Sequence, residues 1–237
     1  MADLCTYLPW DSDFFGRRIA RVTVNQLNDQ QADEVLAWCA AEQIECLYFL
    51  AEANDAETVR TAEKYGFAFV DIRYTVERRA AFPEMPAGIR LSRPEDIPTL
   101  KAIARTKHRD SRFYYDGHFT QEECDRLYET WVERSAEGFS DAVIVAEREQ
   151  QPVGYMTCHV QGEVGHLDLL GVDDQWLGQG IGKDLVIGSV AWLGTRGVAY
   201  VELATQGRNI RAQRIFQRFG FISQGIQLWY HRWFLPA

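Results

Sequence analysis

Three glycines at alternate positions form the part of the sequence best suited to chemistry. Gly178, Gly180 and Gly182 follow an apolar run that ends at Val172, and a helix-like pattern runs from Lys183 to Leu193. A strand, a tight turn and a helix N-terminus leave backbone N–H groups unpaired, and glycine lets a phosphate approach them closely. The spacing indicates a site for a phosphorylated cofactor, although Gly-x-Gly-x-Gly also occurs in ordinary turns.

Two other phosphate-binding motifs do not fit this loop. No Gly-Lys-Ser or Gly-Lys-Thr follows it, which argues against a nucleoside triphosphate with its magnesium ion. The spacing also differs from Gly-x-Gly-x-x-Gly, and the loop lies in the last third of the chain instead of opening it. Neither an ATPase nor a dinucleotide-dependent dehydrogenase is favoured.

A second motif follows the glycine loop, and the two together carry a resemblance. The residues are Asn209, Ala212, Ile215-Phe216 and Gly220-Phe221. In this order the motifs resemble the GNAT superfamily of acetyl-CoA-dependent N-acetyltransferases, from roughly Gly88 to the C-terminus. The resemblance implies an α/β fold with a central mixed, splayed β-sheet flanked by helices, acetyl-CoA as cosubstrate and no metal.

The resemblance also implies how acetyl-CoA is held. Main-chain amides of the strand end pair with the pantetheine arm, and loop amides hold the pyrophosphate. Asn209 matches an Asn that meets the pantetheine arm, although Asn is also a good helix N-cap. Arg214 is a candidate for the phosphates or an ordinary solvated arginine. The expected cofactor-binding residues are Leu170, Gly171, Val172, Leu177, Gly178, Gln179, Gly180, Ile181, Gly182, Lys183, Asn209 and Arg214.

Two positions depart from the family pattern. Leu177 stands where Arg or Gln is usual, which costs little if the loop amides hold the pyrophosphate. Phe216 stands where most members have a Tyr that protonates the departing thiolate, and a phenyl ring has no proton to donate. The proton must then come from solvent or from another side chain; the unranked candidates are Tyr155, Cys158, His159 and Tyr230.

Acetyl transfer to an amine requires a base, because only the uncharged amine is nucleophilic. Some relatives carry a Glu at the position of Asp168, so Asp168 is the first candidate base and His166 the second. Strand alternation predicts that Asp168 shares a face with His166 and Leu170. The alternative is that Asp168 is a surface carboxylate.

A basic and aromatic segment precedes these motifs in an otherwise acidic chain. It contains Arg105, Lys107, His108, Arg109, Arg112, Phe113, Tyr114 and Tyr115. Arginine forks suit diphosphate oxygens, and aromatic rings can stack on a base or sugar. The expected substrate-binding residues are Arg109, Arg112, Phe113 and Tyr115; the alternative is a solvated basic loop with one aromatic side chain turned inward.

Short segments along nearly the whole chain look like the dTDP-fucosamine N-acetyltransferases of bacterial surface-polysaccharide synthesis. They are residues 8–16, 110–113, 128–131 and 204–209. This resemblance implies transfer of acetyl to the primary amine of a nucleotide-linked amino-deoxysugar, a small-molecule substrate. The alternatives are a GNAT enzyme acting on a peptide N-terminus or polyamine, and, because of Phe216, a catalytically silent acetyl-CoA-binding module.

The apolar periodicity alternates between strands and helices. Strands are expected at 19–24, 46–50, 67–78, 142–147, 153–160, 166–172, 200–205 and up to about 234, and helices within 32–39, 59–65, 97–104, 120–131, 183–193 and 209–219. Residues 110–119 are expected to be irregular. We interpret residues 1–82 as a truncated GNAT-like N-terminal domain and residues 88–237 as the acetyl-CoA-binding catalytic domain.

Composition limits the partners. The chain of 237 residues has a net charge of −9, which argues against nucleic acid as a partner. No apolar stretch approaches the roughly 20 residues of a membrane span, so a cytoplasmic location without membrane insertion is expected. The five scattered cysteines indicate buried free thiols instead of a zinc or disulfide framework. Four C-terminal aromatics suit either core packing or a homodimer contact: Trp229, Tyr230, Trp233 and Phe234.

Overall fold

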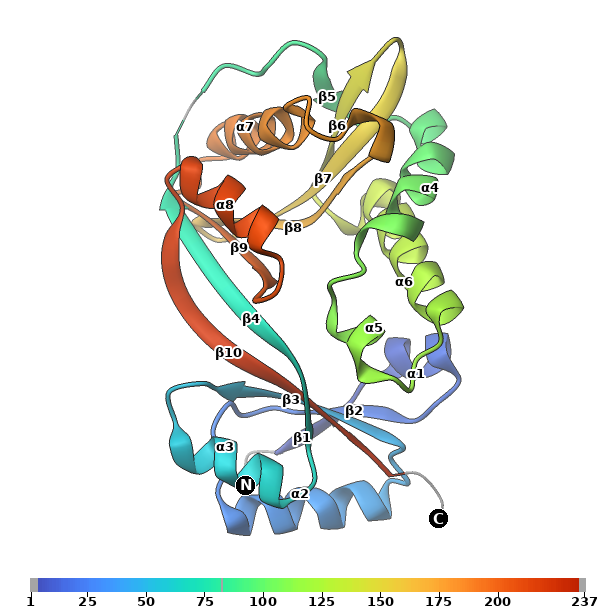
Figure 1. The fold of residues 1–237 in the computed structure, drawn as a ribbon, viewed down its shortest axis with the longest axis vertical. Helices are drawn as coiled ribbons and strands as arrows, with labels where there is room; N and C mark the ends of the chain where they lie inside the picture. The colour runs from blue at the N-terminus through green and yellow to red at the C-terminus, as the bar shows by residue number, and fades with distance from the viewer. Residues whose placement is uncertain (1–3, 82, 235–237) are drawn as a thin grey trace.

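Ten strands form one mixed sheet in the computed structural model, which describes residues 4–81 and 83–234. Their order across the sheet is β1-β2-β3-β10-β4-β9-β8-β7-β6-β5 (Figure 1). The strands are β1 Cys5–Tyr7, β2 Ile19–Val22, β3 Cys46–Glu52, β4 Ala68–Arg79, β5 Ile89–Leu91, β6 Ala142–Arg148, β7 Gln151–Gln161, β8 Val164–Val172, β9 Tyr200–Gln206 and β10 Ile222–Trp233.

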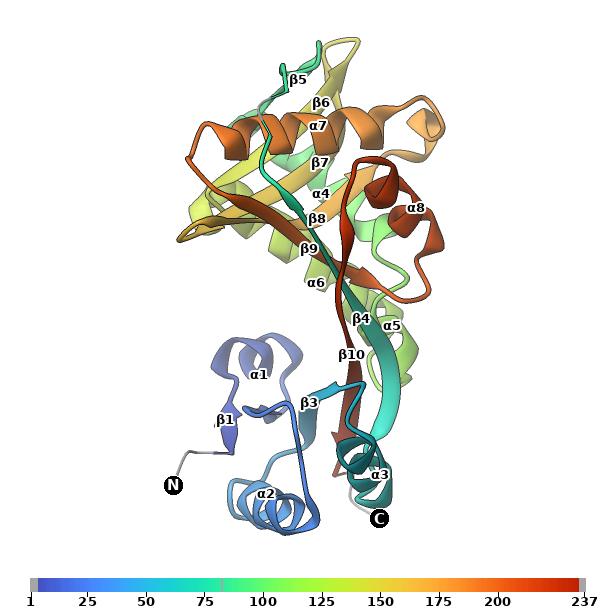
Figure 2. The ribbon, with the colours of Figure 1, turned by 90° about the vertical axis from the view of Figure 1, so that its left-hand side faces the viewer.

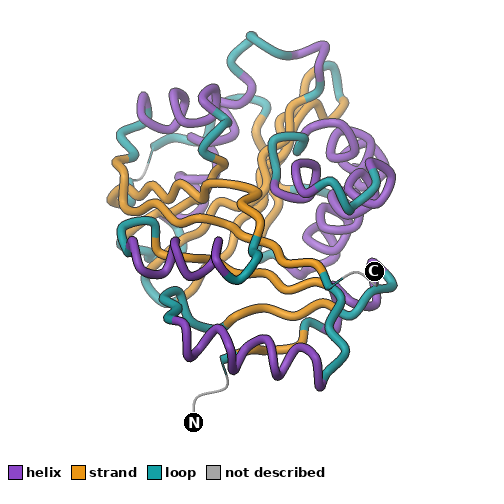
Figure 3. The backbone as a smooth tube through the Cα atoms, turned by 60° about the horizontal axis from the view of Figure 1, so that its bottom comes forward, coloured by secondary structure: helices purple, strands orange, loops and turns teal. Residues whose placement is uncertain are grey.

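Helices cover both faces of this sheet. One face carries α7 and α8 at one end and α2 and α3 at the other, while α1, α4, α5 and α6 pack on the opposite face (Figures 1 and 2). Figure 3 shows helices lying along the strands at the end formed by β1 to β3. The helices are α1 Pro9–Phe15, α2 Asp29–Ala41, α3 Ala56–Lys64, α4 Ile97–Lys107, α5 Arg112–Asp116, α6 Gln121–Arg134, α7 Ile181–Gly194 and α8 Ile210–Arg218.

The expected α/β architecture is confirmed, and most expected elements occur within a few residues of their predicted bounds. Thr120 caps α6 through a reciprocal pair of hydrogen bonds with Glu123. The helix after the glycine loop begins at Ile181 instead of Lys183. The segment 110–119, expected to be irregular, contains the short helix α5, and the sequence analysis missed β1, α1 and β5.

The C-terminal strand joins the two ends of the sheet. β10 lies between β3 and β4 and is antiparallel to both, so residues near the C-terminus complete a sheet begun near the N-terminus. The C-terminal aromatics pack in the cores: Tyr230 and Phe234 against α2 and α3, and Trp229 and Trp233 on the opposite face. The domain boundary between residues 82 and 88 stays a prediction, and the sheet continues across it through the pairing of β4 with β9.

The cysteines are buried and unpaired, as expected for free thiols: Cys5, Cys39, Cys46, Cys124 and Cys158. Among the residues that the structure describes, no helix has the length and apolar character to cross a membrane.

Candidate functional site

Two parallel strands part at the centre of the sheet. The pairing of β8 with β9 ends at Leu167 and Leu203, although β8 continues to Val172 and β9 to Gln206. Beyond that point, no strand in the described part of the chain pairs with the β8 edge facing β9, so its backbone N–H and C=O groups are available to a ligand. The splay that the resemblance implied is therefore present, at the strand end that contains Gly171.

A bulge in β8 places the candidate base and Leu170 on opposite faces of the sheet. At Asp168 and Leu169, two residues of β8 face Thr157 of β7, whose hydroxyl oxygen accepts a 2.9 Å hydrogen bond from the N–H of Leu169. The prediction that Asp168 and Leu170 share a face is wrong because the extra residue breaks the alternation. Leu170 packs in the core under α7, whereas Asp168 opens onto the face covered by α4 to α6, as His166 does by its register.

The glycine loop presents an open helix N-terminus. Gly178 and Gly180 have φ of +82° and +85°, a left-handed conformation that favours glycine, and Gly180 caps α7. A Cβ at either position would have no heavy atom within 4 Å, so the space before the helix is free. The first N–H groups of α7 have no acceptor within the helix. Leu177, Gln179 and Lys183 are exposed around this space.

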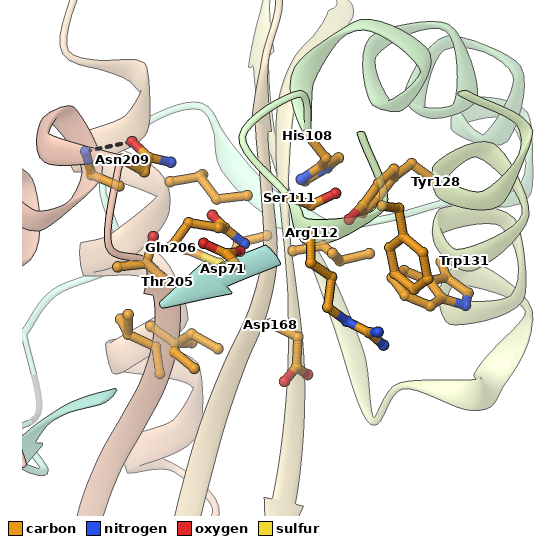
Figure 4. Close-up of a pocket in the computed structure, with 18 of the residues that line it drawn as sticks. Asp71, His108, Ser111, Arg112, Tyr128, Trp131, Asp168, Thr205, Gln206 and Asn209 are labelled. Carbon is orange, nitrogen blue, oxygen red and sulfur yellow. Dashed lines mark hydrogen bonds between the residues drawn. The ribbon is translucent and has the colours of Figure 1, made fainter. Parts of the chain in front are cut away.

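A pocket of about 320 Å³ lies beside the parted strands. Figure 4 shows Thr205, Gln206 and Asn209 on one side and Tyr128 and Trp131 on the other. The pocket therefore extends from the start of α8 to the face covered by α4, α5 and α6. Its lining is Asp71, His108, Ser111, Arg112, Phe113, Tyr128, Trp131, Met156, Leu167, Asp168, Leu169, Leu170, Leu203, Ala204, Thr205, Gln206, Asn209, Ala212, Phe216 and Trp229.

A second pocket adjoins the first at the candidate base. Trp131, Asp168 and Leu169 line both pockets, and the second continues toward α1 past Trp10 and His159. Asp168 thus lies where the two pockets meet. An acceptor molecule has two directions in which to extend from this point.

The carboxylate of Asp168 is accessible yet poorly solvated. Its side chain is 44% exposed, and its Oδ2 lies 3.5 Å from Nε2 of His159. Because Asp168 sits in a concave site, burial raises its pKa above the ordinary value, and the charges of His159, His166 and Arg73 oppose that rise. A carboxylate with a raised pKa is a better proton acceptor for an ammonium group, so its environment suits a general base. His166, the second candidate, faces Glu202 at 3.8 Å.

The side chains considered as proton donors differ in position. Cys158 and Tyr230 are buried in cores away from the pocket lining, and His159 lies beside Asp168. Tyr155 is fully buried, but its hydroxyl group is 2.7 Å from Nε2 of His108, and His108 lines the pocket. The hydroxyl group of Tyr155 therefore communicates with the pocket through the imidazole of His108.

The residues expected on α8 occupy different surroundings. Asn209 lines the pocket and caps α8, with its side-chain oxygen accepting a 3.0 Å hydrogen bond from the N–H of Ala212 (Figure 4). Both roles considered for Asn209 are thus sterically compatible. Phe216 also lines the pocket, whereas Arg214 is exposed and outside the lining.

The four expected substrate-binding residues do not all lie at the pocket. Arg112 and Phe113 line the pocket, with Phe113 deep in the core beneath α5 and α6. Arg109 is 49% exposed, and Tyr115 is 56% exposed and outside the lining. In the same segment, Arg105 pairs with Glu122 and Glu129, and Lys107 pairs with Asp174, so ion pairs within the protein take up part of this basic cluster.

A buried hydrogen-bonded chain holds Arg112. The guanidinium contacts Nε2 of His231, and Nδ1 of the same ring contacts Asp116. Burial lowers the pKa of His231 to about 4, so near neutral pH its Nδ1–H donates to Asp116 and its Nε2 accepts from Arg112. Burial alone would raise the pKa of Asp116, but hydrogen bonds from His231 and Trp233 outweigh it and lower the pKa to about 2. The Arg112 side chain is positioned by this chain.

Acid should destabilise the fold through its buried imidazoles. Burial lowers the pKa of His108 and of His231 to about 4 each from 6.5, so the unfolded chain binds more protons between these values. The free energy of unfolding is therefore expected to fall as pH falls from 6.5, by about 1.4 kcal/mol per pH unit for each imidazole. Urea unfolding at several pH values measures the slope. His108→Gln should reduce this slope by the contribution of about one proton. A slope equal to that of the wild type would contradict this prediction.

The sequence analysis did not assign several other lining residues to the site, among them Asp71 and Trp229. Asp71 comes from β4 and Trp229 from β10, and the two are register partners. Burial raises the pKa of Asp71 to about 6, although Arg208 at 3.2 Å opposes that rise. Neither residue belongs to a local motif, so no sequence signal joined them to the site. Among the described residues, no group of three His, Cys, Asp or Glu side chains is arranged to hold a metal ion.

Comparison with known proteins assigns a family to the region that contains most of this site. Residues 103–221 match the model of the acetyltransferase (GNAT) family. A crystal structure of a GCN5-related N-acetyltransferase from Sphaerobacter thermophilus has the same fold, with a TM-score of 0.66 and 18% identity over 98% of this chain and 77% of that one.

Three relatives have similar sequences. The spore coat polysaccharide biosynthesis protein SpsD of Bacillus subtilis is 25% identical over 64% of this chain and 53% of its own length. A mycothiol acetyltransferase of Thermobispora bispora is 30% identical over 63% and 52%. The chain thus spans about half the length of these two proteins. A dTDP-fucosamine acetyltransferase of Escherichia coli is 23% identical over 95% of this chain and 96% of its own length.

Proposed function

The chain belongs to the acetyltransferase (GNAT) family, and from this premise we propose that it transfers acetyl from acetyl-CoA to the primary amine of a nucleotide-linked amino-deoxysugar. The observation that carries the proposal is the strand splay next to an open helix N-terminus. Similarity to the dTDP-fucosamine acetyltransferase over nearly the full length of both chains supports the sugar nucleotide as acceptor. The name of SpsD supports a role in polysaccharide synthesis.

The residues at the splay fit the cofactor. The unpaired β8 edge from Asp168 to Val172 offers main-chain groups to an amide-containing arm, as a strand pairs with an added peptide. The left-handed turn at Gly178 and Gly180 leaves room for a diphosphate against the first N–H groups of α7. Asn209 and Phe216 line the pocket between them. When bound, acetyl-CoA supplies the acetyl group as an activated thioester.

Asp168 removes the proton that makes the amine unreactive. A substrate ammonium in the pocket donates a proton to the carboxylate, directly or through water, and the free amine forms the new C–N bond as the C–S bond breaks. The proton passes from Asp168 to solvent through the exposed side of the pocket. Since Phe216 has no proton to donate, the thiolate takes its proton from water or from the His108–Tyr155 pair.

An acceptor panel tests the proposal. The purified protein is incubated with acetyl-CoA and dTDP- or UDP-linked amino sugars, peptides or polyamines, while release of free thiol is followed. Turnover confined to the sugar nucleotides is the expected result. Turnover with peptides or polyamines instead would overturn the acceptor, and tight binding of acetyl-CoA with no turnover on any amine would support the catalytically silent module that Phe216 suggests.

A further inference from the structure

The sheet brings arginines from distant parts of the sequence onto one face. Arg21 of β2 is the register partner of Tyr48 of β3, and Tyr48 is the partner of His231 of β10. Arg73 of β4 is aligned with Gln206, which lines the pocket. Because partners across a sheet point to the same side, Arg21 and Arg73 share the face that carries His231 and the pocket.

A third arginine, Arg112, reaches this face from α5, and an aromatic ring lies near both Arg112 and Arg21. The guanidinium carbon of Arg112 is 4.3 Å from the ring centre of Trp229, and that of Arg21 is 5.4 Å from it. Tyr48 and Phe113 each lie 4.2 Å from the same Arg112 carbon. Aromatic faces attract cations but do not neutralise their charge.

These arginines interact with carboxylates only at longer range than an ion pair. Arg73 lowers the pKa of Asp168 through space, and Arg112 does the same for Asp11 and Asp71. Within residues 4–81 and 83–234, neither Arg21, Arg73 nor Arg112 forms a salt bridge, whereas Arg208 pairs with the neighbouring Asp71. The Nε atoms of Arg21 and Arg73 are buried without a hydrogen-bond partner. Burial lowers the pKa of Arg21, and the charges of Arg112 and Arg73 lower it further. Half-buried guanidinium groups without an ion-pair partner are costly, so the arrangement favours a bound anion.

We propose that Arg21, Arg73 and Arg112 form an anion-binding site around Trp229 that holds the phosphate groups of the amine-bearing acceptor. The identity of that acceptor rests on the proposed function. Planar guanidinium groups bind phosphate oxygens in pairs, and several on one face of the sheet suit a diphosphate. Arg73 is close enough to Asp168 to lower its pKa, so one molecule can place an amine at Asp168 and a phosphate at the arginines. The same cluster repels a polyamine.

Calorimetric binding of dTDP, thymidine and inorganic pyrophosphate to the full chain tests the site. Arg73→Gln and Arg21→Gln should each weaken dTDP binding by about tenfold or more, the effect of losing a charged hydrogen bond. Arg79→Gln, on the same strand but exposed beside Tyr200, should bind dTDP like the wild type. Thymidine should bind weakly to every variant, and coenzyme A should not displace dTDP.

The outcomes separate this site from the proposed function. Equal dTDP affinity of the wild type and Arg73→Gln, or displacement of dTDP by coenzyme A, would overturn the site. If dTDP binds through the arginines but no dTDP-linked amino sugar is acetylated, the anion-binding site is supported and the proposed acceptor is wrong. If Arg73→Gln acetylates such a sugar with an unchanged KM, the proposed anion-binding site is wrong and the proposed function is supported. A melting temperature no lower than that of the wild type shows that each variant is folded.

Discussion

Asp168→Asn is expected to lower kcat for acetyl transfer by about a hundredfold or more, the size of a general-base contribution, without weakening acetyl-CoA binding. The amide matches the carboxylate in shape but cannot accept the substrate proton at neutral pH. Asp168 stands where the two pockets meet, and its bulged strand aims it away from the core under α7. Steady-state kinetics with a sugar nucleotide, together with calorimetry of coenzyme A, measure both quantities.

The pH profile distinguishes a base from a residue that only shapes the pocket. Because burial raises the pKa of Asp168, the acidic limb of the wild-type rate profile should lie above the ordinary aspartate range, with activity lost as pH falls through it. His159→Gln removes a charge that lowers this pKa, so it should move the limb to higher pH while activity persists. In Asp168→Asn the limb should disappear.

Stability and a surface variant provide the controls. The folded state disfavours the ionised form of Asp168, so replacing it with Asn should leave the free energy of unfolding unchanged or higher at neutral pH. Glu163→Gln changes an exposed carboxylate just before β8 and should leave kcat unaltered. If Asp168→Asn retained full activity, His166 would become the leading candidate base.

The parts of the site that could be predicted are those with local chemistry. Left-handed glycines before α7 and the Asn209 cap of α8 are determined by turn and capping preferences within a few residues. Expectations for the helices and most strands followed from apolar periodicity, which needs no knowledge of neighbours. The family motifs lie in this local class.

The remaining parts depend on how distant strands align. Trp229, Asp71 and Arg73 meet only because β10 inserts between β3 and β4, an order that periodicity does not encode. The bulge beside Thr157 has no sequence signal, yet it separates Asp168 from Leu170, so of the two predicted neighbours only His166 shares the face of Asp168. For the same reason, the basic segment around Arg109 gave an incomplete picture of the positive charge, since Arg21 and Arg73 come from other strands.

Gly180→Val is expected to weaken binding of acetyl-CoA by at least about a hundredfold, because it closes the diphosphate position and strains the turn that presents it. Gly180 has a φ of +85°, and its missing side chain leaves open space before the N–H groups of Ile181 and Gly182. A branched side chain would fill that space. Calorimetry with coenzyme A, which needs no acceptor, gives the affinity directly.

A matched glycine at the other end of the same helix provides the control. It distinguishes backbone strain in the turn from obstruction of the diphosphate position. Gly197 follows α7, has a φ of +76° and also has no heavy atom within 4 Å of a built Cβ. Gly197→Val should therefore lose a similar amount of stability, about 1–2 kcal/mol for a left-handed residue, while binding coenzyme A like the wild type. Equal coenzyme A affinity in the two valine variants would mean that the loop does not hold the diphosphate, and the acetyl-transfer proposal would lose its main support.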